Sequence, residues 1–231
     1  MRNVVVVGVP RADPAVVAEL ATFGVATVHE AQSRGGYLGS GLRPVQDGAR
    51  IGGTAVTAVC WPGDNLMVHA AVEQCGDGDV LVVTTTSLCT DGMVGELIAT
   101  SLASRGVRGV VVNAGVRDVA ELRALGFPAW AAAVSAQGTV KQTPGAVNVP
   151  VSIGGQLIRP GDAIIADDDG VVCVPRLTVA DVLEASRQRA AKEAGTRERL
   201  ASGALGLDLH GLRDTLAARG VLYVAAEEFR E

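Results

Sequence analysis

The middle of the chain alternates between apolar segments that fit β-strands and amphipathic segments that fit helices. Residues 79–85, 107–113 and 129–134 are rich in small and β-branched apolar side chains, whereas residues 95–105 and 118–125 have helical periodicity. Strands that are joined through helices by short connections pair in parallel, with right-handed crossovers. The pattern therefore predicts an α/β fold built around parallel βαβ units.

The composition restricts how this fold can be packed. Hydrophobic residues make up 48% of the 231 residues, but aromatic residues only 3%. The core must therefore consist of small aliphatic side chains, which suit buried parallel strands covered by helices. The length is sufficient for one large domain, or for one domain with a tail.

Further elements are predicted before the central pattern. Asp13 is a suitable N-cap for a helix over residues 14–22, with proline at its first position. A long loop over residues 33–44 precedes a strand over residues 51–59 and a helix over residues 65–74.

The chain changes in character after the central pattern. Short apolar runs separated by glycine, proline and aspartate turns predict a small antiparallel or mixed β unit, with strands at residues 149–153, 156–158, 163–166 and 171–174. Residues 178–200 form a heavily charged helix, and residues 212–218 a last amphipathic segment. We expect this tail to pack on a neighbouring subunit.

Acidic residues exceed basic ones, and this limits the partners. There are 25 Asp and Glu against 20 Lys and Arg, with a net charge of −5 and a pI near 5.3. No basic run is present that would bind a phosphate backbone, so we expect no nucleic-acid partner. The apolar run over residues 4–9 is too short for a secretory signal, and no stretch approaches the roughly 18 apolar residues of a membrane helix. We expect a cytoplasmic protein with no membrane partner.

The cysteines and the common motifs exclude several chemistries. Cys60, Cys75, Cys89 and Cys173 form no C-x-x-C pair, which favours buried reduced thiols over a zinc or redox site. The chain contains no P-loop, dinucleotide fingerprint, nucleophile elbow or zincin motif.

Two loops of the parallel pattern are candidates for a binding site. In parallel sheets, ligands bind beyond the carboxyl ends of the strands. The loop over residues 86–94 leads to Glu96 at the start of one helix, and the loop over residues 114–116 leads to Arg117 and Asp118 at the start of the next. If the strands are neighbours, a carboxylate-binding arginine and two acids converge, which suits an oxo acid chelated by Mg²⁺ or Mn²⁺.

Each of these residues also has a structural interpretation. Asp118, with Glu121 three residues later, is typical of a helix N-cap, and Glu96 is a favourable first-turn acid. Residues 167–170 resemble a metal cluster but fit a hairpin turn better. His29, near the end of a possible strand, and His69, on a helical face, are more often structural than functional.

Several strings of residues resemble one known family. They are Gly24-Val-Ala-Thr-Val-His-Glu-Ala-Gln32, Pro62-Gly-Asp-Asn65, Gly95-Glu-Leu97, Gly115-Val-Arg-Asp118 and Ala166-Asp-Asp-Asp-Gly-Val171. Together they resemble the 4-hydroxy-4-methyl-2-oxoglutarate / 4-carboxy-4-hydroxy-2-oxoadipate aldolase family of the RraA-like superfamily. The most specific element is an acid followed, after twenty residues, by Arg-Asp, as Glu96 is followed by Arg117 and Asp118.

The resemblance implies a fold and an assembly. The fold would be an RraA-like α/β/α sandwich over residues 1–176, with central parallel βαβ units, a small β segment and a helical extension over residues 177–231. The extension would pack on a neighbouring subunit of a homotrimer or homohexamer, with active sites between subunits.

The resemblance also implies roles at the site. Asp118 would ligate Mg²⁺ or Mn²⁺, and Glu96 would hold a metal-bound water. Arg117 would bind pyruvate and its enolate, and the amides of the segment Gly95-Glu96-Leu97 would receive the carboxylate.

Other residues would complete the implied site. Glu30 and Glu193 would come from a neighbouring subunit and, like Glu96, are candidates for orienting the base. Asn65 and His69 would lie near the substrate.

The implied reaction is a class II retro-aldol cleavage of either named substrate, giving pyruvate together with pyruvate or oxaloacetate. Oxaloacetate decarboxylation would be a side activity, because it passes through the same enolate.

The alternatives are an RraA-like regulator that binds ribonuclease E, a dedicated oxaloacetate decarboxylase, or an aldolase for another 2-oxo acid. Two departures from the family pattern bear on this choice: Glu96 stands where aspartate is common, and Gly36-Tyr37-Leu38 stands where Thr-Gly-Leu is expected.

Overall fold

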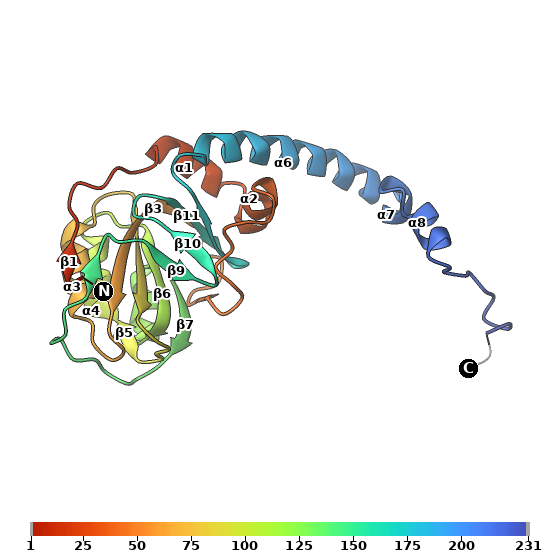
Figure 1. The fold of residues 1–231 in the computed structure, drawn as a ribbon. Helices are drawn as coiled ribbons and strands as arrows, with labels where there is room; N and C mark the ends of the chain where they lie inside the picture. Colours follow the sequence, from red (N-terminus) through yellow and green to blue (C-terminus); the bar gives the residue numbers. More distant parts are fainter. Residues whose placement is uncertain (1, 230–231) are drawn as a thin grey trace. The chain divides into compact units, whose positions relative to one another are not determined.

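A computed structural model describes residues 2–229 of the chain (Figure 1). It divides into two compact units, Met1–Arg187 and Gln188–Glu231. The boundary lies inside helix α6 (Val179–Ala201). The division predicted after residue 176 stays a prediction.

The first unit is built on one large sheet. Its main path, within the described residues, is β1-β8-β3-β4-β6-β7-β2. The strands are β1 (Val4–Val5), β8 (Ala146–Val147), β3 (Ile51–Cys60), β4 (Asp79–Thr85), β6 (Gly109–Val116), β7 (Ala129–Val134) and β2 (Arg43–Pro44). The pairs β3–β4, β4–β6 and β6–β7 are parallel, so the predicted βαβ core is confirmed.

The strands of the predicted small antiparallel or mixed β unit are divided between two sheets. The strands β9 (Val151–Ile153) and β10 (Gln156–Ile158) form a small antiparallel sheet of their own. The strands β11 (Ala163–Asp167) and β12 (Gly170–Val174) instead join the main sheet. The reason is the length of β3, whose first residues pair with β11 and whose later residues pair with β8. The turn between β11 and β12 is the predicted hairpin.

Helices cover the main sheet and bury small aliphatic side chains (Figure 1). They are α1 (Pro14–Ala21), α2 (Val25–Ala31), α3 (Leu66–Gln74), α4 (Glu96–Ala103) and α5 (Val119–Leu125). Val68, Leu102 and Leu122 of α3, α4 and α5 belong to one buried cluster with the strands. Leu20 of α1 belongs to another, with α2, β11, β12 and the start of α6.

The start of α1 agrees with its prediction, whereas α2 does not. The Asp13 carboxylate accepts the N–H groups of Ala15 at 2.8 Å and Val16 at 3.2 Å, which is the predicted N-cap. The possible strand before His29 is wrong, since this segment is helix α2. The β-branched Val25 and Val28 pack one turn apart in the core, so tertiary packing overrides their strand preference.

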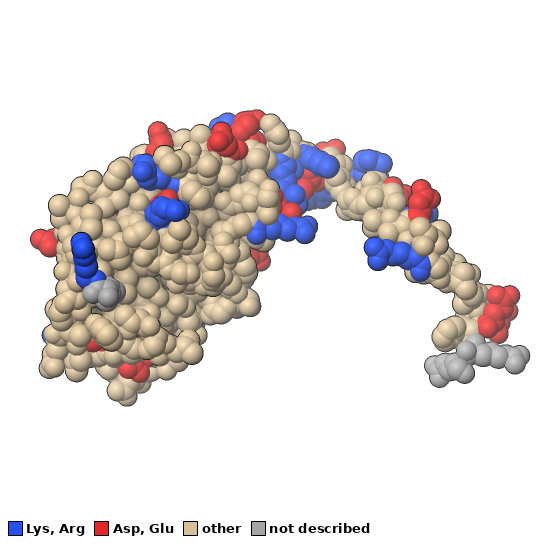
Figure 2. Space-filling view, in the orientation of Figure 1, with Lys and Arg blue, Asp and Glu red and all other residues tan. Residues whose placement is uncertain are grey.

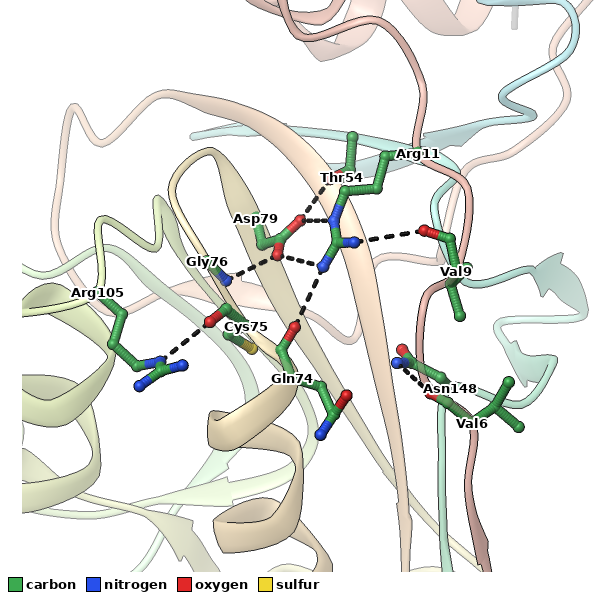
Figure 3. A network of polar contacts seen from close by, with 10 residues as sticks. All are labelled: Val6, Val9, Arg11, Thr54, Gln74, Cys75, Gly76, Asp79, Arg105 and Asn148. Carbon is green, nitrogen blue, oxygen red and sulfur yellow. Dashed lines mark hydrogen bonds and ion pairs between the residues drawn. The ribbon is translucent and has the colours of Figure 1, made fainter.

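A polar network fixes the N-terminal segment to the sheet (Figure 3). The buried Asp79 carboxylate accepts Nε of Arg11 at 2.7 Å and Nη2 at 2.8 Å. It also accepts the Thr54 hydroxyl at 2.5 Å and the Gly76 N–H at 2.9 Å. This bidentate pair raises the pKa of Arg11. The segment before α1 is thereby held against the start of β4.

The second unit is helical and has no buried residue in its described part. It contains the end of α6, α7 (Gly206–Leu209) and α8 (Leu212–Ala218), so the predicted helices over 178–200 and 212–218 are confirmed. Leu205, Leu222 and Tyr223 are exposed. Packing of this unit on a neighbouring subunit stays a prediction. Among the residues that the structure describes, no helix has the length and apolar character needed to span a membrane.

Candidate active site

The two predicted loops meet at the carboxyl ends of neighbouring strands. The short strand β5 (Gly92–Val94), which was not predicted, pairs in parallel with the end of β6. The backbone N–H of Arg117 donates to the carbonyl of Val94 at 3.0 Å. This pairing places the start of α4 beside the start of α5, so the predicted convergence is confirmed for Arg117 and Asp118. The Glu96 carboxylate instead turns to Thr100 of its own helix.

Asp118 joins the two helix starts. Its Oδ2 accepts the backbone N–H of Glu96 at 3.2 Å and lies 3.3 Å from Nε of Arg117. Asp118 occupies the predicted N-cap position of α5, but its side chain makes no capping hydrogen bond to that helix. Its backbone is left-handed, with φ 56°, and the carboxylate is directed to α4. A left-handed non-glycine residue costs about 1 kcal/mol, which the surrounding contacts must offset.

Glycines allow the close approach of these loops. A Cβ at Gly95 would overlap the Asp118 carboxylate and come within 3.0 Å of Cγ of Arg117. A Cβ at Gly115 would overlap the carbonyl of Thr90. The backbone at these positions therefore requires glycine.

A cavity of about 130 Å³ lies at this junction. The predicted residues that line it are Asn65, His69, Gly95, Leu97, Arg117 and Asp118. On its other side, the Arg117-Asp118 pair lines a second hollow of about 280 Å³ together with residues 134–136. Arg117 and Asp118 therefore line both hollows.

Asn65 and His69 enter the cavity from the start of α3. Asn65 is 5% exposed, and its Nδ2 donates to the carbonyl of Met93 at 3.0 Å. Its Oδ1 is buried and accepts no hydrogen bond within the described residues, which is unusual for a buried polar atom. Burial lowers the pKa of His69, and the charge of Lys141 lowers it further. His69 is therefore neutral at pH 7.

Thr139 and Lys141 also line the cavity and were not predicted. They follow β7, at the same edge of the sheet as the loops after β4 and β6, but their loop leads to the short strand β8 and not to a helix. Asp64 holds this loop, because its Oδ2 accepts the N–H groups of Gln142 at 2.9 Å and Thr143 at 2.6 Å. Burial opposes the charge on Asp64, but these N–H groups and that of Leu66 outweigh it and lower the pKa.

The remaining predicted acids lie outside the lining of this cavity. The Glu96 carboxylate accepts the Thr100 hydroxyl of its own helix at 2.8 Å. Glu30, on α2, pairs with Arg34 at 3.0 Å. Glu193 lies on α6 in the second unit and pairs with Arg189 at 2.8 Å. Their roles stay predictions.

The arrangement suits a small anion. Two cations, Arg117 and Lys141, border the cavity, and the first turn of α4 carries N–H groups without partners in the helix. No group of three or more His, Cys, Asp or Glu side chains forms a metal site among residues 2–229. However, Asp118 Oδ1 makes no hydrogen bond to any described residue, and one carboxylate suffices for a Mg²⁺ ion that keeps water and chelates its substrate.

These features define an α/β protein with a cavity bordered by two cations and an aspartate at the carboxyl ends of parallel strands. The RraA-like family model, described as Aldolase/RraA, matches residues 25–173, and the chain belongs to this family.

Named relatives and a solved structure agree with this placement. A relative from Halalkalibacterium halodurans, provisionally named 4-hydroxy-4-methyl-2-oxoglutarate aldolase, is 31% identical over 71% of this chain and 78% of its own length. A relative from Burkholderia multivorans with the same provisional name is 37% identical over 66% of this chain and 94% of its own. The crystal structure of Streptomyces coelicolor RraAS2, described as an unusual member of the RNase ES inhibitor RraA family, has a TM-score of 0.75 and 29% identity. The match covers 82% of this chain and 99% of that one. The fold is therefore RraA-like.

Proposed function

We propose that this protein is a class II pyruvate aldolase that cleaves 4-hydroxy-4-methyl-2-oxoglutarate or 4-carboxy-4-hydroxy-2-oxoadipate. The observation that carries the proposal is the small cavity in which Arg117, Lys141 and Asp118 meet the start of α4. The provisional aldolase names of the relatives support it.

Arg117 would hold the part of the substrate that becomes pyruvate. Its guanidinium can donate to the 1-carboxylate and the 2-oxo oxygen, on which negative charge develops during cleavage. The Glu96 N–H already donates to Asp118, so the amide of Leu97 and the other first-turn amides of α4 would donate to the same carboxylate. The cavity volume of about 130 Å³ fits a group of this size.

Asp118 would hold Mg²⁺ or Mn²⁺ through its unpaired Oδ1. When bound, the metal would supply positive charge beside the 1-carboxylate and the 2-oxo oxygen. The ion pair with Arg117 and the bond from the Glu96 N–H would keep the carboxylate in place.

The reaction needs a base for the C4 hydroxyl. Loss of that proton allows the C3–C4 bond to break, and its electron pair forms the pyruvate enolate, which is then protonated at C3. Glu96 is a candidate base from the same chain, and Glu30 and Glu193 are candidates from neighbouring copies in a homotrimer or homohexamer. Oxaloacetate decarboxylation would give the same enolate.

Lys141 would bind the second carboxylate of the substrate. Both proposed substrates carry a carboxylate beyond the bond that breaks, and Lys141 is a second cation on the cavity wall. The protein would therefore prefer 2-oxo acids with at least one further carboxylate to monocarboxylic ones.

A coupled pyruvate assay tests this function. We expect pyruvate release from both substrates with Mg²⁺, slower release from oxaloacetate, and none after EDTA treatment. Activity that survives complete metal removal would contradict the metal-dependent mechanism. Failure of every 4-hydroxy-2-oxo acid and of oxaloacetate would contradict the aldolase proposal.

The likeness to RraAS2 supports a second candidate, a regulator that binds ribonuclease E. This candidate predicts inhibition of ribonuclease E by the purified protein, retained by an Arg117→Ala variant. An aldolase would lose its activity in the same variant.

A further inference from the structure

A separate hollow lies at the end of the sheet opposite to Arg117. It has a volume of about 550 Å³ and is bordered by the start of β3, the residue before β4 and the residue before β6. Because β3, β4 and β6 are parallel, these amino ends lie together, away from the carboxyl ends that carry the candidate active site. The two cavities share no lining residue.

Small side chains keep this hollow open. Helix α1 packs directly on the start of β3, where a Cβ at Gly52 would come within 2.7 Å of Cβ of Ala21. Val17, Ala18 and Ile51 supply further apolar surface. The part of the hollow between α1 and the start of β3 is therefore suited to an apolar group.

Guanidinium groups lie at the rim, and two of them have donors to spare. Arg11 already donates two hydrogen bonds to the Asp79 carboxylate. Arg50 donates once, to the carbonyl of Thr22 at 3.2 Å, and pairs with no carboxylate among the described residues. Arg108 lies 3.6 Å from Asp77, and both side chains are more than half exposed. Figure 2 shows basic side chains on this face, between α1 and the nearby end of β3.

We propose that this cavity binds a small amphipathic anion, a carboxylate carried on an apolar chain or ring. The carboxylate would lie at the rim, where Arg50 and Arg108 each retain several N–H donors. The apolar part would lie against α1 and the start of β3. The volume of about 550 Å³ is within the range of small-molecule sites, roughly 300–1,000 Å³.

Octanoate is a suitable probe, because it combines one carboxylate with a short apolar chain. Titration calorimetry on the full chain should detect saturable binding, and 1-octanol and octylamine should bind at least about tenfold more weakly. Binding of all three compounds with equal affinity would overturn the proposal, because it would show that the arginines do not recognise the carboxylate.

Variants separate the two parts of the site. Arg50→Gln should weaken octanoate binding about tenfold through the loss of a charged donor. Ala18→Phe should block the apolar part, since Ala18 lines the hollow but is exposed and not part of the core. Arg43→Gln is the matched control, because Arg43 is exposed and does not line this cavity.

The proposal does not depend on the aldolase function, since binding is measured without turnover. Circular dichroism should show that each variant is folded. Absence of octanoate binding to the wild type at millimolar concentration would overturn the proposal. Unchanged binding in both Arg50→Gln and Ala18→Phe would do the same.

Discussion

The carboxylate of Asp118 accepts the backbone N–H of Glu96 at 3.2 Å, so this acid closes the first turn of the neighbouring helix α4. The same carboxylate lies 3.3 Å from Nε of Arg117. The contact fixes the starts of two helices relative to each other at the candidate active site. The two side-chain contacts also offset the cost of the left-handed backbone of Asp118.

Gly95→Ala should disrupt this contact. The added Cβ would overlap the Asp118 carboxylate, so Asp118 and Arg117 would have to move. We expect pyruvate release to fall by about a hundredfold, since small displacements of catalytic groups are costly. Gly41→Ala is the control, because its Cβ would meet open space and its φ is not positive. Equal activity of the two variants in the pyruvate assay would argue against the importance of the contact.

Lys141→Met should change substrate preference. If Lys141 binds the second carboxylate, KM for 4-hydroxy-4-methyl-2-oxoglutarate should rise about tenfold or more, with little change for the monocarboxylate 4-hydroxy-2-oxopentanoate. The exposed Lys192→Met is the matched control. An equal rise in KM for both substrates would show that Lys141 does not distinguish them.

The Lys141→Met variant can also be tested without turnover, through the pKa of His69. Burial and the charge of Lys141 lower the pKa of His69. Removing that charge should raise the pKa of His69 part of the way to its ordinary value, because burial remains. An NMR titration of His69 measures this, and an unchanged pKa would show that the two side chains do not interact.

Asp64→Asn should destabilise the protein in a pH-dependent manner. The folded pKa of Asp64 is below its ordinary value of 3.8. Its stabilising contribution is therefore complete above about pH 4 and is lost as the pH falls through the folded pKa. Replacement by asparagine should cost about 2 kcal/mol at pH 7. Urea unfolding at pH 7 and pH 3 should show a smaller difference at pH 3, and a constant difference would contradict this assignment.

Arg11→Gln should reduce stability more than Arg108→Gln. Arg11 compensates the charge of Asp79, which is 1% exposed, whereas Arg108 and Asp77 form an exposed pair. We expect a loss of about 2–4 kcal/mol for Arg11→Gln and about 0–1 kcal/mol for Arg108→Gln. Equal unfolding free energies of the two variants would contradict this interpretation of the network.

Local pattern was sufficient for most elements of the first unit. The strands at 79–85 and 129–134 have the predicted bounds, because a short, mainly apolar run directly after a glycine or a proline has few alternatives. Helix α2 was not predicted, since its valines favour strands and only packing against β11 and β12 selects the helix.

The sequence predicted two of the loops that form the candidate active site, but not the third, which carries Lys141. The loops after β4 and β6 were recognised because each leads into a helix, where an anion site is expected. Lys141 lies on a loop that leads to the short strand β8 instead, so no helix signal pointed to it. The capping partner of Asp118 could not be found from sequence, because the bond joins residues 22 positions apart.

Pyruvate release from 4-hydroxy-4-methyl-2-oxoglutarate by the wild type and by Arg117→Ala, with Mg²⁺ present and Arg43→Ala as the matched control, tests the proposed active site most directly. We expect a loss of about a thousandfold in kcat/KM for Arg117→Ala, because no other donor can neutralise the enolate as well, and a near-normal rate for Arg43→Ala. A folded Arg117→Ala variant with near-wild-type turnover would contradict the central claim.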